Sequence, residues 1–281
     1  MARPVRFAVP VVAAQGTALP LIICLHGLGG GIADITQLLS GGLAGLRSSY
    51  VVAAPQGASG GSWNVVGEPS LAPDVHLISS LIDFAEGFSN VDTTRVVIYG
   101  YSNGAALAHR LMIESGDRRI IAAVMESAQL NERQFRNGGF YTAGSDRAYS
   151  RVVPLATQTL ARRRVMMISG SADSTIPAAG GESELVVDHL TGERLSFVSV
   201  TGSVLAYATA KDAAANISTR GDGAHGASLT YHSTVGGDVQ VSCVIGPGLH
   251  RVRCASCQGC IGSGVNSVVD EASHLTPPDA T

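Results

Sequence analysis

The chain has 281 residues, of which 45% are hydrophobic and 15% charged, and its formal net charge at pH 7 is −3. This composition is typical of a soluble globular protein with a large core, and the scattered lysines and arginines exclude a basic stripe for nucleic acid. No apolar run reaches the roughly 18 residues that a membrane-spanning helix needs. We therefore expect a single domain over residues 1–281, with neither nucleic acid nor membrane as a partner.

The N-terminal residues 1–16 contain two arginines and a short apolar run. This run is a poor signal peptide, because Pro10 interrupts it and a long apolar core is missing. We expect residues 5–12 to form the first β-strand. The compartment stays open, since a leader could have been removed.

Apolar runs then alternate with segments of helical periodicity. The runs that predict strands are residues 19–27, 50–57, 94–100, 120–127, 164–170, 228–233 and 238–246. Residues 75–88 carry apolar side chains on one helical face, with Asp74 as the expected N-cap, and a second helix follows Ser102. Repeated strand–helix–strand order predicts an α/β fold with a mostly parallel central sheet and helices on both faces.

Three stretches do not follow this rhythm. Residues 131–161 and 201–226 have little apolar period, and we expect them to form loops and short helices over the carboxyl edge of the sheet. Residues 261–281 contain Pro277 and Pro278 and are expected to form a loosely ordered tail.

The segment from Arg95 to Leu111 reads RVVIYGYSNGAALAHRL, so an apolar strand passes through Gly-Tyr-Ser-Asn-Gly directly into a helix. One interpretation is an ordinary turn. The other is a strained turn that exposes Ser102, in which Gly100 and Gly104 allow tight turning without a Cβ clash. The G-x-S-x-G pattern alone does not decide between them.

Other strand ends supply residues that match a nucleophilic serine. In an open α/β sheet, ligands bind beyond the carboxyl ends of the strands. Asp173 follows the strand at residues 164–170, and His250 follows the strand at residues 238–246. The sequence therefore predicts Ser102 as nucleophile, His250 as its general base and Asp173 as the carboxylate that orients the imidazole.

A glycine-rich loop, HGLGGG from His26 to Gly31, follows the strand at residues 19–27. We expect the backbone N–H of Leu28 (or of Gly29) and that of Asn103 to form an oxyanion hole, in which a donor is worth roughly 3–4 kcal/mol. Gly29, Tyr101 and Trp63 are the predicted substrate-binding residues. Trp63 has two interpretations, since it could line an acyl pocket or anchor a loop.

Several titratable residues have simpler interpretations. His26 is expected to be structural at the base of the loop, and His76 and His109 to lie on helices at or near the surface. The alternatives for the base and the acid are His225, His232, Asp212 and Asp222.

The chain has five cysteines. Cys24 lies in an apolar strand and is expected to be buried. Cys254, Cys257 and Cys260 form C-x-x-C-x-x-C, which we interpret as a disulfide or free thiols, because a metal site needs a fourth ligand and His250 is engaged elsewhere. We therefore expect no metal and no cofactor.

Taken together, the segments PLIICLHGLGG, VVAAPQG, NVDTTRVVIYGYSNGAALAHRL, MMISGSADSTIPAAGG and DVQVSCVIGPGLH resemble the α/β-hydrolase esterases grouped as polyhydroxybutyrate depolymerase-like and feruloyl esterase-like proteins. The resemblance spans roughly residues 5–250. It implies an α/β-hydrolase fold and a serine esterase without cofactor, frequently secreted. It also implies Ser102, Asp173 and His250 as the triad, with Leu28 and Asn103 as oxyanion donors.

The chain departs from this family at two places. Ala105 stands where similar proteins usually have a second glycine, and the segment after His250 reads RVRCASCQGC instead of an aromatic residue and a proline. The expected substrates are short-chain, hydroxycinnamoyl or polyester-oligomer esters. A serine peptidase on the same fold and a non-catalytic binding protein remain the alternatives, and the oligomeric state is open.

Overall fold

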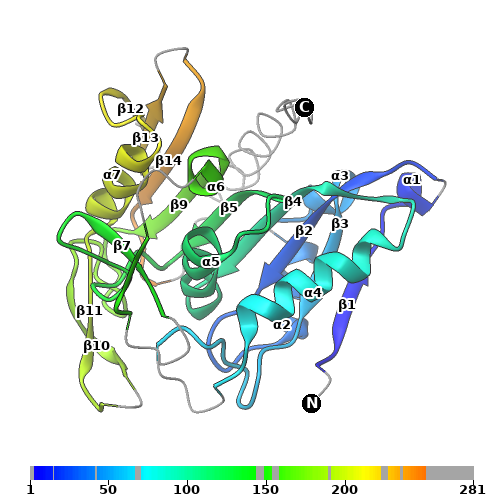
Figure 1. Ribbon diagram of the computed structural model, residues 1–281, viewed down its shortest axis with the longest axis horizontal. Coiled ribbons are helices and arrows are strands. Elements are labelled where there is room, and N and C mark those ends of the chain that lie inside the picture. Colours follow the sequence, from blue (N-terminus) through cyan, green and yellow to red (C-terminus); the bar gives the residue numbers. More distant parts are fainter. Residues whose placement is uncertain are drawn as a thin grey trace.

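A computed structural model describes residues 3–14, 16–41, 43–66, 71–143, 149–153, 158–188, 191–222, 227–234 and 237–250. Its central sheet has nine strands in the order β1-β3-β2-β4-β5-β9-β14-β13-β12 (Figure 1). Their bounds are β1 Val5–Ala8, β2 Leu19–Leu25, β3 Val51–Pro55, β4 Val91–Tyr101, β5 Ile120–Glu126, β9 Arg164–Gly170, β12 Asn216–Asp222, β13 Ala227–Ser233 and β14 Val239–Gly246.

The middle of this sheet is parallel, from β3 through β2, β4, β5 and β9 to β14. The edges are antiparallel, because β1 pairs with β3 in that sense and β13 pairs so with both β14 and β12. All parallel strands therefore end at one edge, where the loops that follow them come together. The predicted mostly parallel sheet is confirmed.

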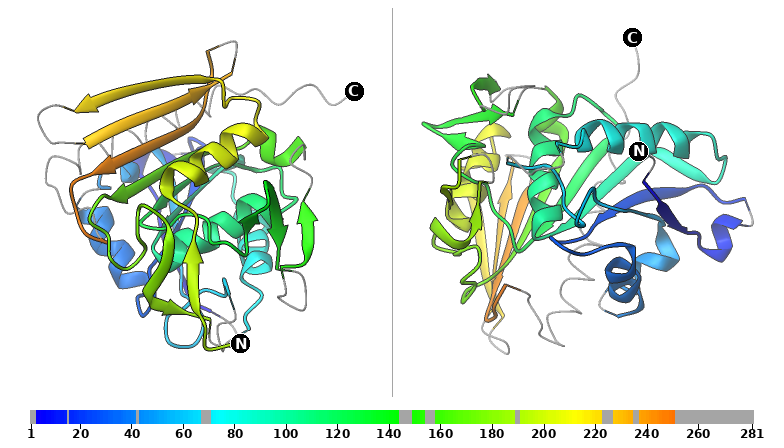
Figure 2. Two further views of the ribbon diagram at one scale, coloured as in Figure 1. Left: turned by 90° about the vertical axis from the view of Figure 1, so that its left-hand side faces the viewer. Right: turned by 90° about the horizontal axis from the view of Figure 1, so that it is seen from below.

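Helices cover both faces of the sheet, as Figure 2 shows with α4 and α5 on one side and α2 on the other. The helices are α1 Val11–Ala14, α2 Ile32–Ser40, α3 Leu46–Ser49, α4 Asp74–Glu86, α5 Asn103–Glu114, α6 Gln158–Arg162 and α7 Val200–Ala210. Side chains of β2 alternate between the two layers: Leu21 and Ile23 pack with α4 and α5, and Ile22 packs with α2 and α3. Both faces of the sheet are thus buried, which explains the continuous apolar runs in the sequence.

The N-terminal strand is shorter than predicted. β1 ends at Ala8, and Val11–Ala14 form the short helix α1, so the prediction of a strand over residues 5–12 is wrong beyond Ala8. Pro10 explains the difference, because it has no N–H to donate to the ladder with β3.

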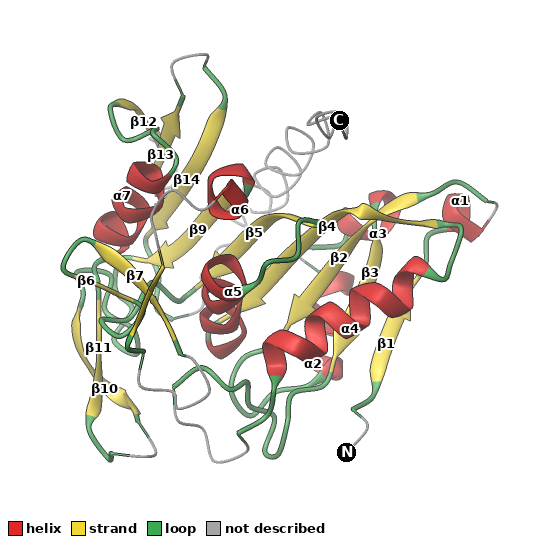
Figure 3. Cartoon of the chain, viewed as in Figure 1, coloured by secondary structure: helices red, strands yellow, loops and turns green. Residues whose placement is uncertain are grey.

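The stretches expected to form loops and short helices contain more regular structure than predicted. In the first stretch, β6 Phe135–Arg136, β7 Gly139–Thr142 and β8 Arg151–Val153 form a small sheet (Figure 3). Outside both stretches, β10 Gly181–Val187 pairs with β11 Arg194–Phe197, two strands that the sequence did not predict. The second stretch contains α7 and β12. The strands β6 and β8 are too short to show a period, and α7 is buried around most of its circumference, so it lacks a polar face.

The two predicted helices are present as α4 and α5, but Asp74 is not the N-cap of α4. Pro73 holds that position, and Asp74 is the first helical residue, with its carboxylate buried. Within the described residues, no helix is long and apolar enough to cross a membrane.

Candidate active site

Ser102 occupies a sharp turn between β4 and α5. Its backbone has φ 52° and ψ −117°, a region that a residue with a Cβ adopts only under strain. Its N–H donates to the Glu126 carbonyl at the end of β5 (2.8 Å), which holds the turn against the neighbouring strand. The structure therefore supports the strained turn over the ordinary one.

The glycines on each side of Ser102 are required by close contacts. A Cβ on Gly100 would lie 2.4 Å from the Gly104 carbonyl oxygen, and a Cβ on Gly104 would lie 2.3 Å from the Leu25 carbonyl oxygen. Neither glycine has a positive φ. The motif thus permits α5 to begin directly against β4 and the end of β2.

Ser102, His250 and Asp173 form a continuous chain of hydrogen bonds. The Ser102 Oγ lies 2.8 Å from His250 Nε2, and His250 Nδ1 lies 2.8 Å from Asp173 Oδ2. Because a carboxylate accepts only, Nδ1 carries the proton and Nε2 accepts from the serine hydroxyl. The structure therefore brings the three predicted residues together in one hydrogen-bonded chain.

Backbone N–H groups hold the carboxylate oxygen of Asp173 that does not bond to His250. Its Oδ1 accepts the N–H groups of Thr175 and Ile176, both at 2.9 Å, and its side chain is buried. The His250 side chain is 22% exposed, so the imidazole reaches the surface. A buried, fully bonded acid beside a partly exposed base favours one imidazole orientation.

The loop that carries His250 passes closely over the end of β9. A Cβ on Gly170 would lie 2.3 Å from the Leu249 carbonyl oxygen. The N–H of Ser171 donates to Gly246 (2.8 Å), and that of Ala172 donates to Gly248 (2.9 Å). These contacts join the loops of Asp173 and His250.

Asn103 directly follows Ser102, and a Cβ on Gly27, the residue before Leu28, would lie 3.5 Å from the Ser102 Cβ. The Gly29 N–H donates to the Gly61 carbonyl (3.1 Å), whereas among the hydrogen bonds of the described residues none uses the Leu28 N–H. Asn103 is the first residue of α5, so no helical carbonyl lies one turn before its N–H. Of the two predicted loop donors, the Gly29 N–H is therefore already used within the loops, and the Leu28 N–H is the one available to a further acceptor.

His26 supports this loop. Its Nε2 accepts the Gly57 N–H, and its Nδ1 donates to the Gly27 carbonyl, both at 2.8 Å. Burial lowers the pKa of His26, which favours the neutral ring that these two bonds require. This geometry agrees with the structural role predicted for His26.

Trp63 is fully buried, which contradicts the interpretation that it lines an acyl pocket. Its indole N–H donates to the His26 carbonyl (2.8 Å), and its backbone N–H donates to Asn103 Oδ1 (2.7 Å). The contacts match the alternative prediction of a loop anchor.

The other two predicted substrate-binding residues border a cavity of about 250 Å³ that the glycine-rich loop helps to line. Its walls are His26, Gly27, Leu28, Gly29, Gly30, Asp34, Ile35, Leu38 and Tyr101. The Tyr101 ring also lies 5.7 Å from the His250 ring, centroid to centroid. Tyr101 is therefore next to His250, although none of Ser102, Asp173 and His250 lines this cavity.

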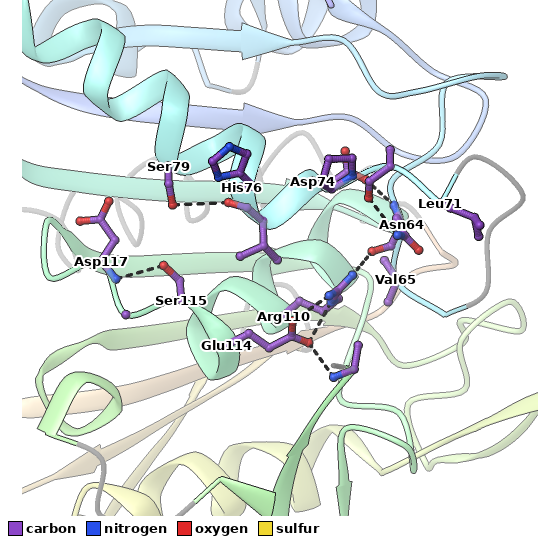
Figure 4. Close-up of a pocket in the computed structure, with 15 residues that line it drawn as sticks. Asn64, Val65, Leu71, Asp74, His76, Ser79, Arg110, Glu114, Ser115 and Asp117 are labelled. Carbon is purple, nitrogen blue, oxygen red and sulfur yellow. Dashed lines mark hydrogen bonds and ion pairs between the residues drawn. The ribbon is translucent and has the colours of Figure 1, made fainter. Parts of the chain in front are cut away.

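A larger pocket of about 530 Å³ lies between the start of α4 and the end of α5 (Figure 4). Its lining includes Asn64, Asp74, Arg110 and Glu114, and none of the three hydrogen-bonded residues. Arg110 and Glu114 bond to each other, and Asp74 accepts the Asn64 N–H, which indicates a structural role.

The alternative bases and acids lie elsewhere. His232 is buried on β13, Asp212 follows α7 and Asp222 ends β12, while His225 lies outside the described residues. His109 is fully buried on α5, so its prediction as a surface or half-buried residue is wrong.

The cysteines divide into two groups. Cys24 is buried as predicted, and burial raises the pKa of both Cys24 and Cys243 to about 12, which makes these thiols unreactive. Cys254, Cys257 and Cys260, like the predicted tail at residues 261–281, lie outside the described residues. Within the described part of the chain, no three His, Cys, Asp or Glu side chains gather as metal ligands would.

No protein-family model matches this chain, and no curated protein matches its sequence. Several solved structures, however, superpose on this chain. A carboxylesterase from Bacillus cereus superposes with a TM-score of 0.56 at 14% identity, covering 95% of this chain and 94% of that one. The chain has the α/β-hydrolase fold.

Two further α/β-hydrolase structures match over nearly their full lengths. An acetyl xylan esterase from Aspergillus awamori has a TM-score of 0.57 at 14% identity, covering 92% of this chain and 93% of that chain. A poly(3-hydroxybutyrate) depolymerase from Bordetella parapertussis has a TM-score of 0.53 at 16% identity, covering 99% and 92%. At these identities the likeness shows an esterase-like α/β-hydrolase fold, and the subtype has to be argued from the site.

Proposed function

We propose that this protein is a serine carboxylester hydrolase that works through an acyl-enzyme. The observation that carries the proposal is the chain of 2.8 Å contacts from Ser102 through His250 to Asp173, with the serine held in a strained turn. The structural neighbours named as esterases support the same reaction class.

The reaction follows from the positions of these groups. His250 Nε2 takes the hydroxyl proton while Ser102 Oγ forms a bond to the ester carbonyl carbon, and the carbonyl oxygen becomes an oxyanion between the N–H groups of Leu28 and Asn103. When the C–O bond to the alcohol breaks, the imidazolium returns the proton to the leaving oxygen. Water, deprotonated by the same imidazole, then releases the acid and restores Ser102.

The substrate is a small or mid-sized ester. The cavity of about 250 Å³ beside Leu28 and Tyr101 has room for one small group of such a substrate. Short-chain acyl, hydroxycinnamoyl and polyester-oligomer esters fit this description, and two neighbours are named for an acetyl ester and a polyester. Every step uses groups of this chain, so the proposal requires no cofactor.

Hydrolysis of p-nitrophenyl acetate and butyrate tests the proposal. We expect turnover by the wild type and a loss of about 10⁴-fold or more in kcat for Ser102→Ala, because no other group replaces the nucleophile. Ser40→Ala, a serine at the end of α2, is the matched control and keeps the wild-type rate. Equal rates for wild type and Ser102→Ala would contradict the proposal. So would turnover of aminoacyl p-nitroanilides without turnover of either ester, which is the peptidase result.

A further inference from the structure

The side chain of Asn103 clamps the backbone of Trp63. Its Oδ1 accepts the Trp63 N–H at 2.7 Å, and its Nδ2 donates to the Trp63 carbonyl at 3.3 Å. One side-chain amide thus bonds both backbone groups of a residue 40 positions away in the sequence. Because Asn103 directly follows Ser102, this clamp fixes Trp63 to the start of α5.

The side chain of Trp63 reaches the other half of the oxyanion hole. Its indole N–H donates to the His26 carbonyl at 2.8 Å, and its ring packs against the His26 ring with centroids 4.8 Å apart. His26 precedes Gly27 and Leu28, and its own ring is bonded to Gly57 and Gly27. Trp63 is therefore bonded at one end to the segment of Asn103 and at the other to the segment of Leu28.

The residue after Trp63 is held from the far side. Asn64 donates its N–H to Asp74 Oδ2 at 2.5 Å, and its carbonyl accepts from the guanidinium of Arg110 (Figure 4). Arg110 in turn makes two bonds to Glu114, at 2.9 and 2.7 Å. Since Asp74 and Arg110 are both buried, the segment of Trp63 and Asn64 has little freedom to shift.

An oxyanion hole depends on the spacing of its donors. Each N–H has to lie about 2.7–3.1 Å from the position that the oxyanion takes, and a shift of about 1 Å is costly. Leu28 and Asn103 come from different loops, so their spacing depends on what joins the loops. Trp63 is 0% exposed and cannot touch substrate, which leaves it an indirect role.

We propose that Trp63 and the side chain of Asn103 are positioning residues that set the distance between the two oxyanion donors. This inference rests on the proposed function, because it assigns a role within the same site. It predicts that breaking either link, from Trp63 to His26 or from Trp63 to Asn103, loosens the hole while leaving Ser102, His250 and Asp173 in place.

The test uses Trp63→Phe, which removes the indole N–H, and Asn103→Ala, which keeps the backbone N–H of Asn103. With p-nitrophenyl acetate we expect each variant to lose about 10-fold or more in kcat with KM within about 3-fold, since a displaced donor weakens binding of the transition state only. The double variant loses no more than the stronger single variant, because both changes break one connection.

Tyr149→Phe is the matched control. The Tyr149 hydroxyl donates to the Val65 carbonyl, so this variant also removes one buried aromatic hydrogen bond from the same loop, without touching either link. We expect a lower Tm and an unchanged kcat. A wild-type kcat in Trp63→Phe, with a fall in Tm like that of Tyr149→Phe, would overturn the positioning role.

A second readout separates this inference from the proposed function. The rate at which a fluorophosphonate labels Ser102 depends on the same hole, because the phosphonyl oxygen occupies it. If the wild type hydrolyses no ester but labels about 10-fold faster than Trp63→Phe, the ester proposal fails and the positioning role stands. Equal labelling rates overturn the positioning role, and no labelling of the wild type overturns both.

Discussion

Gly104 is the residue at which the turn around Ser102 tolerates the least change. A Cβ there would lie 2.3 Å from the Leu25 carbonyl oxygen and 2.6 Å from that of His26, and both are backbone atoms that side-chain rotation cannot relieve. We expect Gly104→Ala to lower the free energy of unfolding by about 3 kcal/mol and to abolish ester hydrolysis, because α5 has to move away from the loop of Leu28.

Gly116→Ala is the control for this prediction. No heavy atom lies within 4 Å of a Cβ built on Gly116, which sits just beyond the end of α5. Urea denaturation and p-nitrophenyl acetate turnover of both variants give the comparison. Similar stabilities for the two variants would show that the contact at Gly104 does not constrain the turn.

His109 makes the stability depend on pH. Burial lowers its pKa to about 4, and the neutral ring accepts from the Tyr207 hydroxyl at Nδ1 (2.9 Å) and donates to the Ala128 carbonyl from Nε2 (3.3 Å). In the unfolded chain His109 binds a proton near pH 6.5, whereas in the folded chain it does so only near pH 4. The contribution of His109 to the free energy of unfolding is therefore largest above pH 6.5, and it decreases by about 3 kcal/mol as the pH drops towards 4.

Urea denaturation between pH 7 and pH 4.5 measures this contribution. We expect His109→Gln to lose less stability over that range than the wild type does. His76→Gln, a change at an exposed histidine of α4, keeps the wild-type dependence. An unchanged dependence in His109→Gln would contradict the assignment.

At the residue scale, the sequence predicted the hydrogen-bonded chain of Ser102, His250 and Asp173 better than it predicted the contacts that support it. Ser102, Asp173 and His250 each follow a strand, so their common location follows from the parallel sheet. The contact between Asn103 and Trp63 joins residues 40 positions apart and has no local pattern. The burial of His109 was missed because its ring packs against Tyr207 of α7, 98 positions away in the sequence, and no local pattern indicates this contact.

At the scale of elements, α5 depends on a buried arginine at its end. The guanidinium of Arg163 donates to five backbone carbonyls, those of Leu111, Met112, Ser115, Asp117 and Ile120, at 2.7–3.2 Å. The carbonyls of Leu111 and Asp117 also accept the N–H groups of Ser115 and Ile120. The last carbonyls of a helix have no partner within it, so Arg163 matters most for the carbonyls of Met112 and Ser115 at the end of α5.

We expect Arg163→Met to lower the free energy of unfolding by about 3 kcal/mol or more, because these carbonyls lose their donor. Arg119→Met is the matched control, since Arg119 binds Asp83, Glu86 and Asp117 with its side chain 26% exposed. Exposed pairs of this kind contribute about 1 kcal/mol or less. Equal losses in the two variants, measured by urea denaturation, would refute the capping role of Arg163.

Whether an element could be predicted depended on its length and on its faces. Helix α4 has one apolar face and one polar face, so its period is visible in the sequence. Helix α7 is buried on most sides, so it shows no apolar period. The strands β6 and β8 have two and three residues, which are too few to show a period. Tertiary packing stabilises these elements, so their local sequence patterns did not predict them.

At the scale of the whole molecule, the positions of the site residues follow from the parallel sheet. The glycine-rich loop, Ser102, Asp173 and His250 follow the ends of β2, β4, β9 and β14, so all four lie at one edge of the sheet. Strand order therefore gathers residues that are far apart in the sequence. The overall architecture was predictable because each strand had its own apolar run, and the superposition on α/β-hydrolase esterases confirms it.

The measurement that tests the central claim most directly is the first turnover with p-nitrophenyl acetate, followed by intact-mass analysis after acid quenching. We expect one acetyl group per chain, located on Ser102 by peptide mapping, and no adduct in Ser102→Ala. Acetylation at another residue, or ester hydrolysis by the wild type and by Ser102→Ala at the same rate, would contradict the account.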